Sequence, residues 1–287
     1  MEVFEHKSVS LYLSGLDLLE TIKSEVQSIQ IYQHDKLGKV LVIDDEIHNV
    51  ERWAPLYHEA IVHIPMMFIE HPTSVLILGG GDLYAAEIAL QYPSVREVVL
   101  CDYDPEVIRL TEKYYSLANS VLSDKRLVIV YQDAKKYLSS CDKQFDLIVD
   151  DCFNLIADFS PDEHIFQVLY DCLTPCVGVC SSLIYRHLFD HDTLSKTKDQ
   201  LFKQFETILS LVTVPEYPGV LHLLTMWGKS PYLSQNMAKS KNLWHLEILK
   251  RKHPFGQLFD PRYCKYYLYL PNYVKETMSI EVHDQNA

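Results

Sequence analysis

Apolar and polar residues along the N-terminal part of the chain follow a pattern typical of β-strands. Two runs rich in β-branched residues, 28–32 and 39–43, are joined by Lys36-Leu37-Gly38, a segment typical of a turn. A helix is then expected to begin near Pro55, because proline is favourable in a first helical turn, and to continue to about residue 65. We therefore expect residues 1–50 to form a small domain of β-strands.

From residue 75 onward, segments with the pattern of strands alternate with segments that have the pattern of helices. The pattern predicts strands at 75–79, 97–102, 127–131 and 146–150, and helices at 83–92, 105–116 and 134–140. Such alternation is typical of an α/β protein with a parallel, doubly wound sheet. We assign residues 51–287 to this second domain, since no repeat or low-complexity linker interrupts it.

A carboxylate stands at or just after the end of each of the four predicted strands of this sheet. Ligands of open parallel sheets bind beyond the carboxyl ends of the strands, which makes these side chains candidates for a site. Helix capping alone would explain one or two acids near strand ends, notably Asp104 in front of Pro105, but it explains the whole set poorly. The four acids are Asp82, Asp102, Asp133 and Asp150, the last followed directly by Asp151.

Three glycines connect the first strand of the sheet to its acid. Gly79, Gly80 and Gly81 let the backbone turn sharply and approach a ligand closely. Asp102, at the end of the next strand, is placed to accept hydrogen bonds from ribose hydroxyls. The run is not a complete G-x-G-x-x-G, so a tight turn without a ligand stays open as an alternative. Together the glycines and the acid favour a nucleotide site.

Composition narrows the class of protein. The chain has 287 residues, 48% of them hydrophobic, which is enough for one large core or a core with a small appended domain. No segment has the apolar length of a membrane span, and the first residues lack the basic start of a secretory signal, so we expect a soluble, cytoplasmic protein. A formal net charge of −13 argues against binding to nucleic acid and is compatible with cationic substrates.

The seven cysteines do not suggest a disulfide framework or a metal site. Cys172, Cys176 and Cys180 recur every four residues, but Pro175 and Gly178 lie between them. The three side chains therefore cannot converge as neighbours on one helix would, and zinc sites usually have tighter paired spacings. We expect small apolar core residues and no bound metal.

Several ordered segments resemble motifs of the spermidine synthase (polyamine aminopropyltransferase) family. Residues 38–44 are similar to YGNVLVLDG, 51–59 to TERDEFxYHE, 75–82 to VLIIGGGD, 101–108 to CEIDEDVI, 214–218 to IPTYP and 263–271 to HRAAFVLP. The resemblance covers nearly the whole chain. It implies a methyltransferase-like Rossmann domain preceded by a small N-terminal β domain.

The resemblance also implies a reaction and a set of site residues. Family members transfer a propylamine group from decarboxylated S-adenosylmethionine to a small cationic amine and release methylthioadenosine. Asp150 and Tyr57 are implied to act on the attacking amine, and Tyr217 to line the acceptor channel. Contacts with the donor are implied for seven residues, with Asp102 on the ribose and Asp133 near the adenine: Gln27, His58, Gly79, Gly81, Asp82, Asp102 and Asp133.

A carboxylate suits this chemistry. A primary ammonium has a pKa of about 10, so the acceptor must lose a proton before its lone pair can attack, and a carboxylate can hold the cation and accept that proton. The transfer is an in-line displacement at a carbon next to a sulfonium. Alignment of the nucleophile, the carbon and the leaving sulfur therefore supplies much of the acceleration.

The chain departs from the family pattern at both substrates. Leu83 and Tyr84 replace the last two glycines of GGGDGG, which predicts two bulky residues beside the donor. When DSSDP is aligned from Asp150, Phe153 stands where the second acid would hold a diamine, and Asp151 becomes an alternative anchor. We therefore expect the acceptor to be an amine other than putrescine.

Three functions stay open at this point. Asp82 favours an aminopropyltransferase, because its charge would attract the amine of a decarboxylated donor. The altered loop at Leu83 and Tyr84 leaves open a transferase that uses intact S-adenosylmethionine and moves a methyl or aminocarboxypropyl group. A catalytically silent paralogue that binds a partner is the third, and the four retained acids argue against it.

The resemblance further implies a homodimer or homotetramer. A hairpin at the N-terminus would leave exposed strand edges, and a neighbouring subunit often covers such edges.

Overall fold

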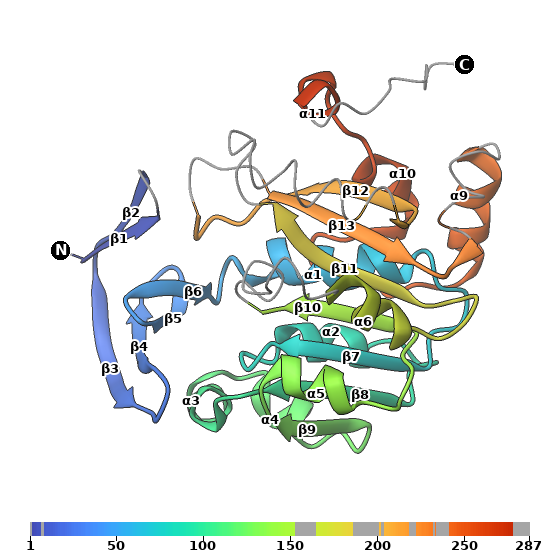
Figure 1. Cartoon of the computed structure of the whole chain (residues 1–287). Coiled ribbons are helices and arrows are strands. Elements are labelled where there is room, and N and C mark those ends of the chain that lie inside the picture. The colour runs from blue at the N-terminus through green and yellow to red at the C-terminus, as the bar shows by residue number, and fades with distance from the viewer. Residues whose placement is uncertain are drawn as a thin grey trace.

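The N-terminal part of the chain forms two antiparallel sheets (Figure 1). The computed structural model describes residues 2–6, 9–152, 165–185, 201, 204–217, 222–231, 233 and 241–277. Strands β1 (Glu2–His6) and β2 (Val9–Leu13) pair with each other. The following four strands form a meander in sequence order: β3 (Leu16–Lys23), β4 (Ser28–His34), β5 (Gly38–Ile43) and β6 (Glu46–Val50). The two strands predicted here, at 28–32 and 39–43, are confirmed, whereas the division of the chain into two domains at residue 50 stays a prediction.

A seven-stranded sheet forms the centre of the rest of the protein, in the order β12-β13-β11-β10-β7-β8-β9. Six strands are parallel, and β13 runs antiparallel to both of its neighbours. The strands are β7 (Ser74–Gly79), β8 (Glu97–Asp102), β9 (Leu127–Tyr131), β10 (Leu147–Asp151), β11 (Val179–Tyr185), β12 (Thr207–Val212) and β13 (His222–Gly228).

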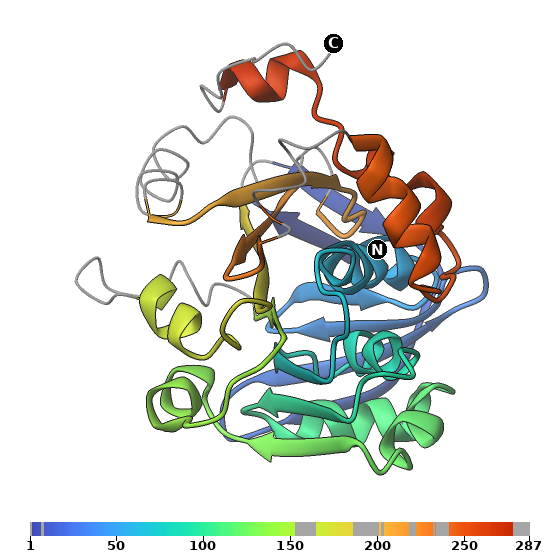
Figure 2. The ribbon, with the colours of Figure 1, turned by 90° about the vertical axis from the view of Figure 1, so that its right-hand side faces the viewer.

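Helices cover both faces of this sheet, as Figure 2 shows. One face packs against α1 (Ala54–Met66), α2 (Tyr84–Leu90), α3 (Pro105–Tyr114), α4 (Ala118–Leu122), α9 (Lys241–Lys250) and α10 (Cys264–Tyr267). The other packs against α5 (Ala134–Ser140) and α6 (Ile165–Asp171). A short helix η1 (Pro261–Tyr263) precedes α10, and α11 (Asn272–Thr277) follows it. The predicted methyltransferase-like Rossmann fold is confirmed, and no described helix has the length and apolar character to cross a membrane.

The order of the strands creates a crevice at the middle of the sheet. From β7 the chain builds β8 and β9 on one side and then returns to place β10 on the other side of β7. Loops that leave the carboxyl ends of β7 and β10 therefore run in opposite directions, which is where open α/β sheets bind ligands. In this crevice Asp151, the last residue of β10, pairs with Gly79, the last residue of β7.

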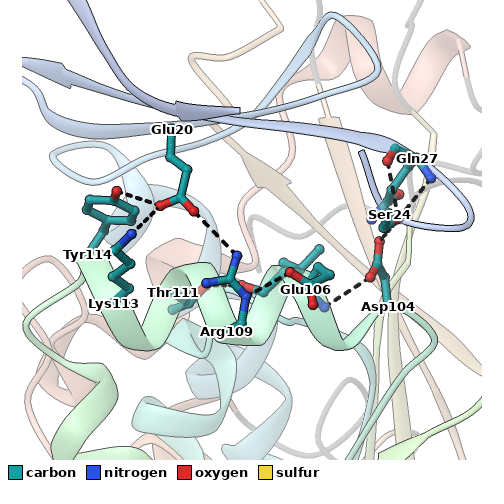
Figure 3. Close-up of polar contacts among 10 residues, drawn as sticks. Glu20, Ser24, Gln27, Asp104, Glu106, Arg109, Thr111, Lys113 and Tyr114 are labelled. Atoms are coloured by element: carbon teal, nitrogen blue, oxygen red, sulfur yellow. Dashed lines mark hydrogen bonds and ion pairs between the residues drawn. The ribbon is translucent and has the colours of Figure 1, made fainter. Parts of the chain in front are cut away.

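Polar contacts hold the N-terminal sheet against α3, at the same end of the large sheet (Figure 3). The carboxylate of Glu20 on β3 accepts hydrogen bonds from Lys113 Nζ and Tyr114 Oη, both at 2.6 Å, and faces Arg109. Ser24 Oγ donates to Asp104 Oδ2 at 2.7 Å. These contacts keep the sheet over the carboxyl ends of β7 and β8.

A buried carboxylate anchors the C-terminal segment to α1. Both oxygens of Glu59 accept backbone amides, from Gln257, Leu258 and Phe259, at 2.6–2.8 Å. A Cβ at Gly256 would lie 2.3 Å from Glu59 Oε2, so a side chain there would displace this carboxylate from the amides that it accepts. The helix that carries Tyr57 and His58 is therefore tied to residues 200 positions further along the chain.

Candidate active site

Two adjoining cavities lie between the N-terminal sheet and the carboxyl ends of the central strands. The larger has a volume of about 370 Å³ and is lined by all seven residues that the family resemblance implied for the donor, from Gln27 to Asp133. The smaller has a volume of about 90 Å³ and includes Tyr217, the residue implied for the acceptor channel. Both cavities are lined by the same five residues where they meet: His48, Tyr57, His58, Asp151 and Cys152.

The glycine run forms the floor of the larger cavity. Gly79 and Gly80 have positive φ angles of 82° and 77°, and a Cβ at Gly79 would lie 2.7 Å from the carbonyl oxygen of Asp151. At Gly81 a Cβ would lie 2.8 Å from Asp102 Oδ2, the same oxygen that accepts the Gly81 amide at 3.0 Å. Only glycine therefore permits this close approach of β7 to both acids.

His58 is placed to carry a positive charge. Its Nδ1 lies 2.9 Å from the carbonyl oxygen of Ala54 and its Nε2 lies 3.2 Å from Asp82 Oδ2, and since both neighbours are acceptors, both ring nitrogens need a proton. Burial opposes the charge, but the carboxylates of Asp82 and then Asp151 raise the pKa of His58 to about 9. His58 is therefore an imidazolium at neutral pH.

Asp82 is the ionised partner of this imidazolium. Burial alone would raise its pKa, but the charge and hydrogen bond of His58 lower the pKa below the ordinary value. Asn49 Nδ2 donates to Asp82 Oδ2 at 2.7 Å, and the amide of Tyr84 donates to Oδ1 at 3.2 Å. The carboxylate of Asp82 is thus held by Asn49 of β6, by His58 of α1 and by the amide of Tyr84 at the start of α2.

Asp151 lies on the other side of His58. Tyr57 Oη donates to its Oδ1 at 2.8 Å, and His58 Nε2 is 3.9 Å from its Oδ2. Burial, reinforced by the charge of Asp82, raises the pKa of Asp151 to about 7, although His58 and Tyr57 act in the opposite direction. This carboxyl group can therefore exchange a proton near neutral pH.

Strand alternation decides which of the two adjacent acids faces Tyr57. Leu147 and Val149 of β10 pack into the core on the α1 face, whereas Ile148 packs on the opposite face. Side chains alternate along a strand, so Asp151 points to the α1 face and Asp150 does not. Asp150 lines only the smaller cavity and accepts the amide of Cys152 at 3.2 Å. The structure therefore favours Asp151 over Asp150, the residue for which the family resemblance implied the catalytic role.

This placement also changes the alignment of the DSSDP segment. If the segment is aligned from Asp151, Asn154 rather than Phe153 stands at its second acid. Both residues lie outside the described part of the chain. The role proposed for Phe153 in the acceptor site therefore stays a prediction.

Comparisons with known proteins agree with this arrangement. The sequence pattern of the spermine/spermidine synthase domain matches residues 54–240. The chain belongs to the spermine/spermidine synthase family. It is 36% identical over 227 residues to the polyamine aminopropyltransferase of Archaeoglobus fulgidus (76% of this chain, 82% of the relative). It is 33% identical over 228 residues to that of Thermoanaerobacter pseudethanolicus (75% and 79%). The structure of spermidine synthase from Thermotoga maritima matches with a TM-score of 0.80 and 25% identity, covering 97% of this chain and 93% of that chain.

The two bulky residues that depart from the family's GGGDGG do not crowd the larger cavity. Leu83 adopts a left-handed conformation, with φ of 69°, and is fully buried in the core. Tyr84 is also buried, and its ring stacks on His58 with centroids 5.3 Å apart. Neither residue lines the larger cavity. The two side chains expected beside the donor thus lie outside this cavity, and Tyr84 supports His58 from behind.

The remaining acids of the larger cavity have fixed positions. Asp102 accepts the amides of Gly81 and Asp104, but burial outweighs both hydrogen bonds and raises its pKa to about 6. Asp133 caps α5 by accepting the amide of Lys136, and it is exposed at the edge of the cavity. Asp104 caps α3, as expected. Gln27 accepts a hydrogen bond from Tyr103 Oη at 2.8 Å, which links the turn between β3 and β4 to the residue that follows Asp102.

Sequence reasoning missed two polar residues of the site, Asn49 and Glu216. Asn49 is almost completely buried and holds Asp82 from β6. Its only signal in the sequence is that the adjacent pair His48 and Asn49 interrupts the apolar residues of a strand. Glu216 lines the smaller cavity from the segment after β12, and no pattern of spacing indicates it.

Among the described residues, one group could in principle hold a metal ion. His58, Asp82 and Asp151 each offer a ligand atom, and these atoms lie within 4.8 Å of one another. A metal ligand must be a neutral imidazole, however, and the pKa of His58 is raised to about 9 by the two carboxylates. A metal ion at this cluster would therefore have to displace the proton of His58.

Proposed function

We propose that this protein transfers a propylamine group from decarboxylated S-adenosylmethionine to an amine and releases methylthioadenosine. The observation that carries the proposal is the junction of the two cavities at Tyr57 and Asp151. A nucleoside donor in the larger cavity and an amine in the smaller one would meet at a carboxyl group that titrates near neutral pH. The names of the polyamine aminopropyltransferase relatives support the same reaction.

Charge in the larger cavity favours a decarboxylated donor. The cluster of His58, Asp82 and Asp151 contains two carboxylates and one imidazolium, so it is negative whenever Asp151 is ionised. A donor that ends in an ammonium group is attracted to this cluster, whereas the carboxylate of intact S-adenosylmethionine is repelled. Asp102 and Asp133 are proposed to bind the ribose and the adenine, as the family resemblance implies.

In the proposed reaction, Asp151 acts first on the acceptor. The acceptor enters as an ammonium ion and transfers one proton to the carboxylate of Asp151, which Tyr57 holds in place by its hydrogen bond. The freed lone pair attacks the propyl carbon bonded to the sulfonium. A carbon–nitrogen bond forms, the carbon–sulfur bond breaks, and the sulfur keeps the bonding electrons as a neutral thioether. The product amine carries the positive charge away.

The acceptor is proposed to be an amine other than putrescine. Neither alignment of the DSSDP segment places a carboxylate at its second acid, because Phe153 or Asn154 stands there. Burying an ammonium without a partner costs several kcal/mol, so a diamine that relied on that acid would bind weakly.

Product analysis tests the proposed reaction. We expect methylthioadenosine and an aminopropylated amine to form in equal amounts from decarboxylated S-adenosylmethionine when a panel of monoamines, diamines and triamines is supplied. Putrescine should be slower than the best acceptor. Products from intact S-adenosylmethionine would favour methyl or aminocarboxypropyl transfer instead, and no product from either donor would favour a partner-binding role.

A pair of variants distinguishes the two adjacent acids. Asp151→Asn should lower turnover by a factor of about 10² or more, because the base is lost, and should leave donor affinity within a few-fold. Asp150→Asn, the matched control, should lower turnover much less. Loss of turnover in Asp150→Asn alone would return the catalytic role to Asp150.

The pH dependence of the wild-type enzyme tests the same assignment. Its kcat/KM for the acceptor should rise with pH through the pKa of Asp151, about 7, since only the ionised carboxylate accepts a proton.

We also propose that the protein forms a homodimer or homotetramer. Large apolar side chains are exposed on and near the N-terminal sheets, among them Tyr12 (52%), Leu18 (54%) and Val26 (57%). A second copy would cover them together with the strand edges. Light scattering at micromolar concentration should give at least twice the chain mass of 33.3 kDa. A monomer throughout that range would contradict the proposal.

A further inference from the structure

Glu216 is a buried carboxylate that the reaction described above does not use. It lies in the segment that follows β12, is 7% exposed, and lines the smaller cavity together with Tyr57 and Asp151. Its Oε1 accepts the amide of Val50, the last residue of β6, at 3.2 Å. One wall of the smaller cavity therefore carries a carboxylate, and the junction with the larger cavity carries another.

No described lysine or arginine forms an ion pair with Glu216. The imidazolium of His58 acts on it electrostatically, but that charge is already shared between Asp82 at 3.2 Å and Asp151 at 3.9 Å. Burial raises the pKa of Glu216 despite its hydrogen bonds with backbone amides. A buried carboxylate without its own cation is costly to maintain, and a cationic ligand would remove this cost.

We propose that Glu216 binds a second ammonium group of the acceptor while Asp151 and Tyr57 act on the first. Glu216 then sets the preference for acceptors that carry a second ammonium group. This inference rests on the proposed function and assigns a specificity-determining residue to the same site.

The position of Glu216 in the sequence supports a role in specificity. Residues 214–218 resemble the family segment IPTYP, in which threonine stands where this chain has Glu216. The chain thus lacks a carboxylate at the second acid of DSSDP and has one in a segment where the family motif has none. Because the two segments differ, the second ammonium would be held at a different point of the cavity, which is consistent with an acceptor other than putrescine.

The test compares acceptors of equal carbon length that carry one or two amines. At saturating decarboxylated S-adenosylmethionine, kcat/KM is measured for 1,3-diaminopropane, putrescine, cadaverine and spermidine, and for propylamine, butylamine and pentylamine. Glu216→Gln keeps an oxygen that can accept the Val50 amide and removes only the charge. It should lower kcat/KM for the best diamine or polyamine by about 10- to 100-fold, the value of a charge-assisted hydrogen bond, and change the monoamine rates less than about twofold.

A matched control separates the charge from the structural role. Glu51 follows Val50 and accepts the amide of Lys39 through Oε2 at 2.7 Å, but it lines neither cavity. Glu51→Gln should therefore leave both classes of acceptor at the wild-type rate. Unfolding midpoints of the two variants show whether each is folded.

Two outcomes would overturn the role of Glu216. One is a Glu216→Gln variant that keeps the wild-type preference for diamines or polyamines over monoamines. The other needs no variant: a wild-type enzyme that uses a monoamine as well as the matching diamine has no second ammonium site. A wild-type enzyme that transfers propylamine to no amine would instead overturn the proposed function, and this inference with it.

Discussion

The site depends on one buried imidazolium, that of His58, which lies between two carboxylates from different strand ends. Asp82 follows β7, Asp151 ends β10, and His58 comes from α1, so the charge cluster joins three elements at the crevice of the sheet. Without the cation, two buried carboxylates this close together could not both ionise. With it, Asp82 stays ionised while the pKa of Asp151 is left at about 7. The two acids of the cluster therefore differ in protonation: Asp82 keeps a constant negative charge, whereas Asp151 can gain or lose a proton near neutral pH.

The N-terminal part of the chain contributes residues to both cavities at the carboxyl ends of the central strands. Asn49 on β6 fixes Asp82, Gln27 reaches the larger cavity, and the amide of Val50 orients Glu216. These contacts require the small sheet to keep a fixed position over the carboxyl ends of the parallel strands. The hydrogen bonds of Glu20 with Lys113 and Tyr114 of α3 hold the small sheet in this position. None of these three residues takes part in the proposed chemistry.

Local patterns in the sequence were sufficient to predict the sheet from residue 75 to 150 and the acids that follow its strands. They were not sufficient to decide between Asp150 and Asp151, because a shift of one residue moves a side chain to the opposite face of a strand, and only the packing of β10 shows which face meets α1. The same holds for Leu83, whose size suggested a bulky residue beside the donor, whereas the side chain turns into the core. Asn49 and Glu216 lie far from the glycine run in sequence, so tertiary structure alone brings them to the site.

The protonation state of His58 is the most direct test of this account. Nitrogen-resolved NMR of the imidazole rings during a pH titration should show His58 protonated up to a pKa of about 9, and its pKa should fall when Asp82→Asn removes the main partner. His63 gives an internal control, because it is buried without a carboxylate and burial lowers its pKa to about 3. A wild-type His58 that loses its proton at or below the ordinary value of about 6.5 would contradict the central role of the imidazolium.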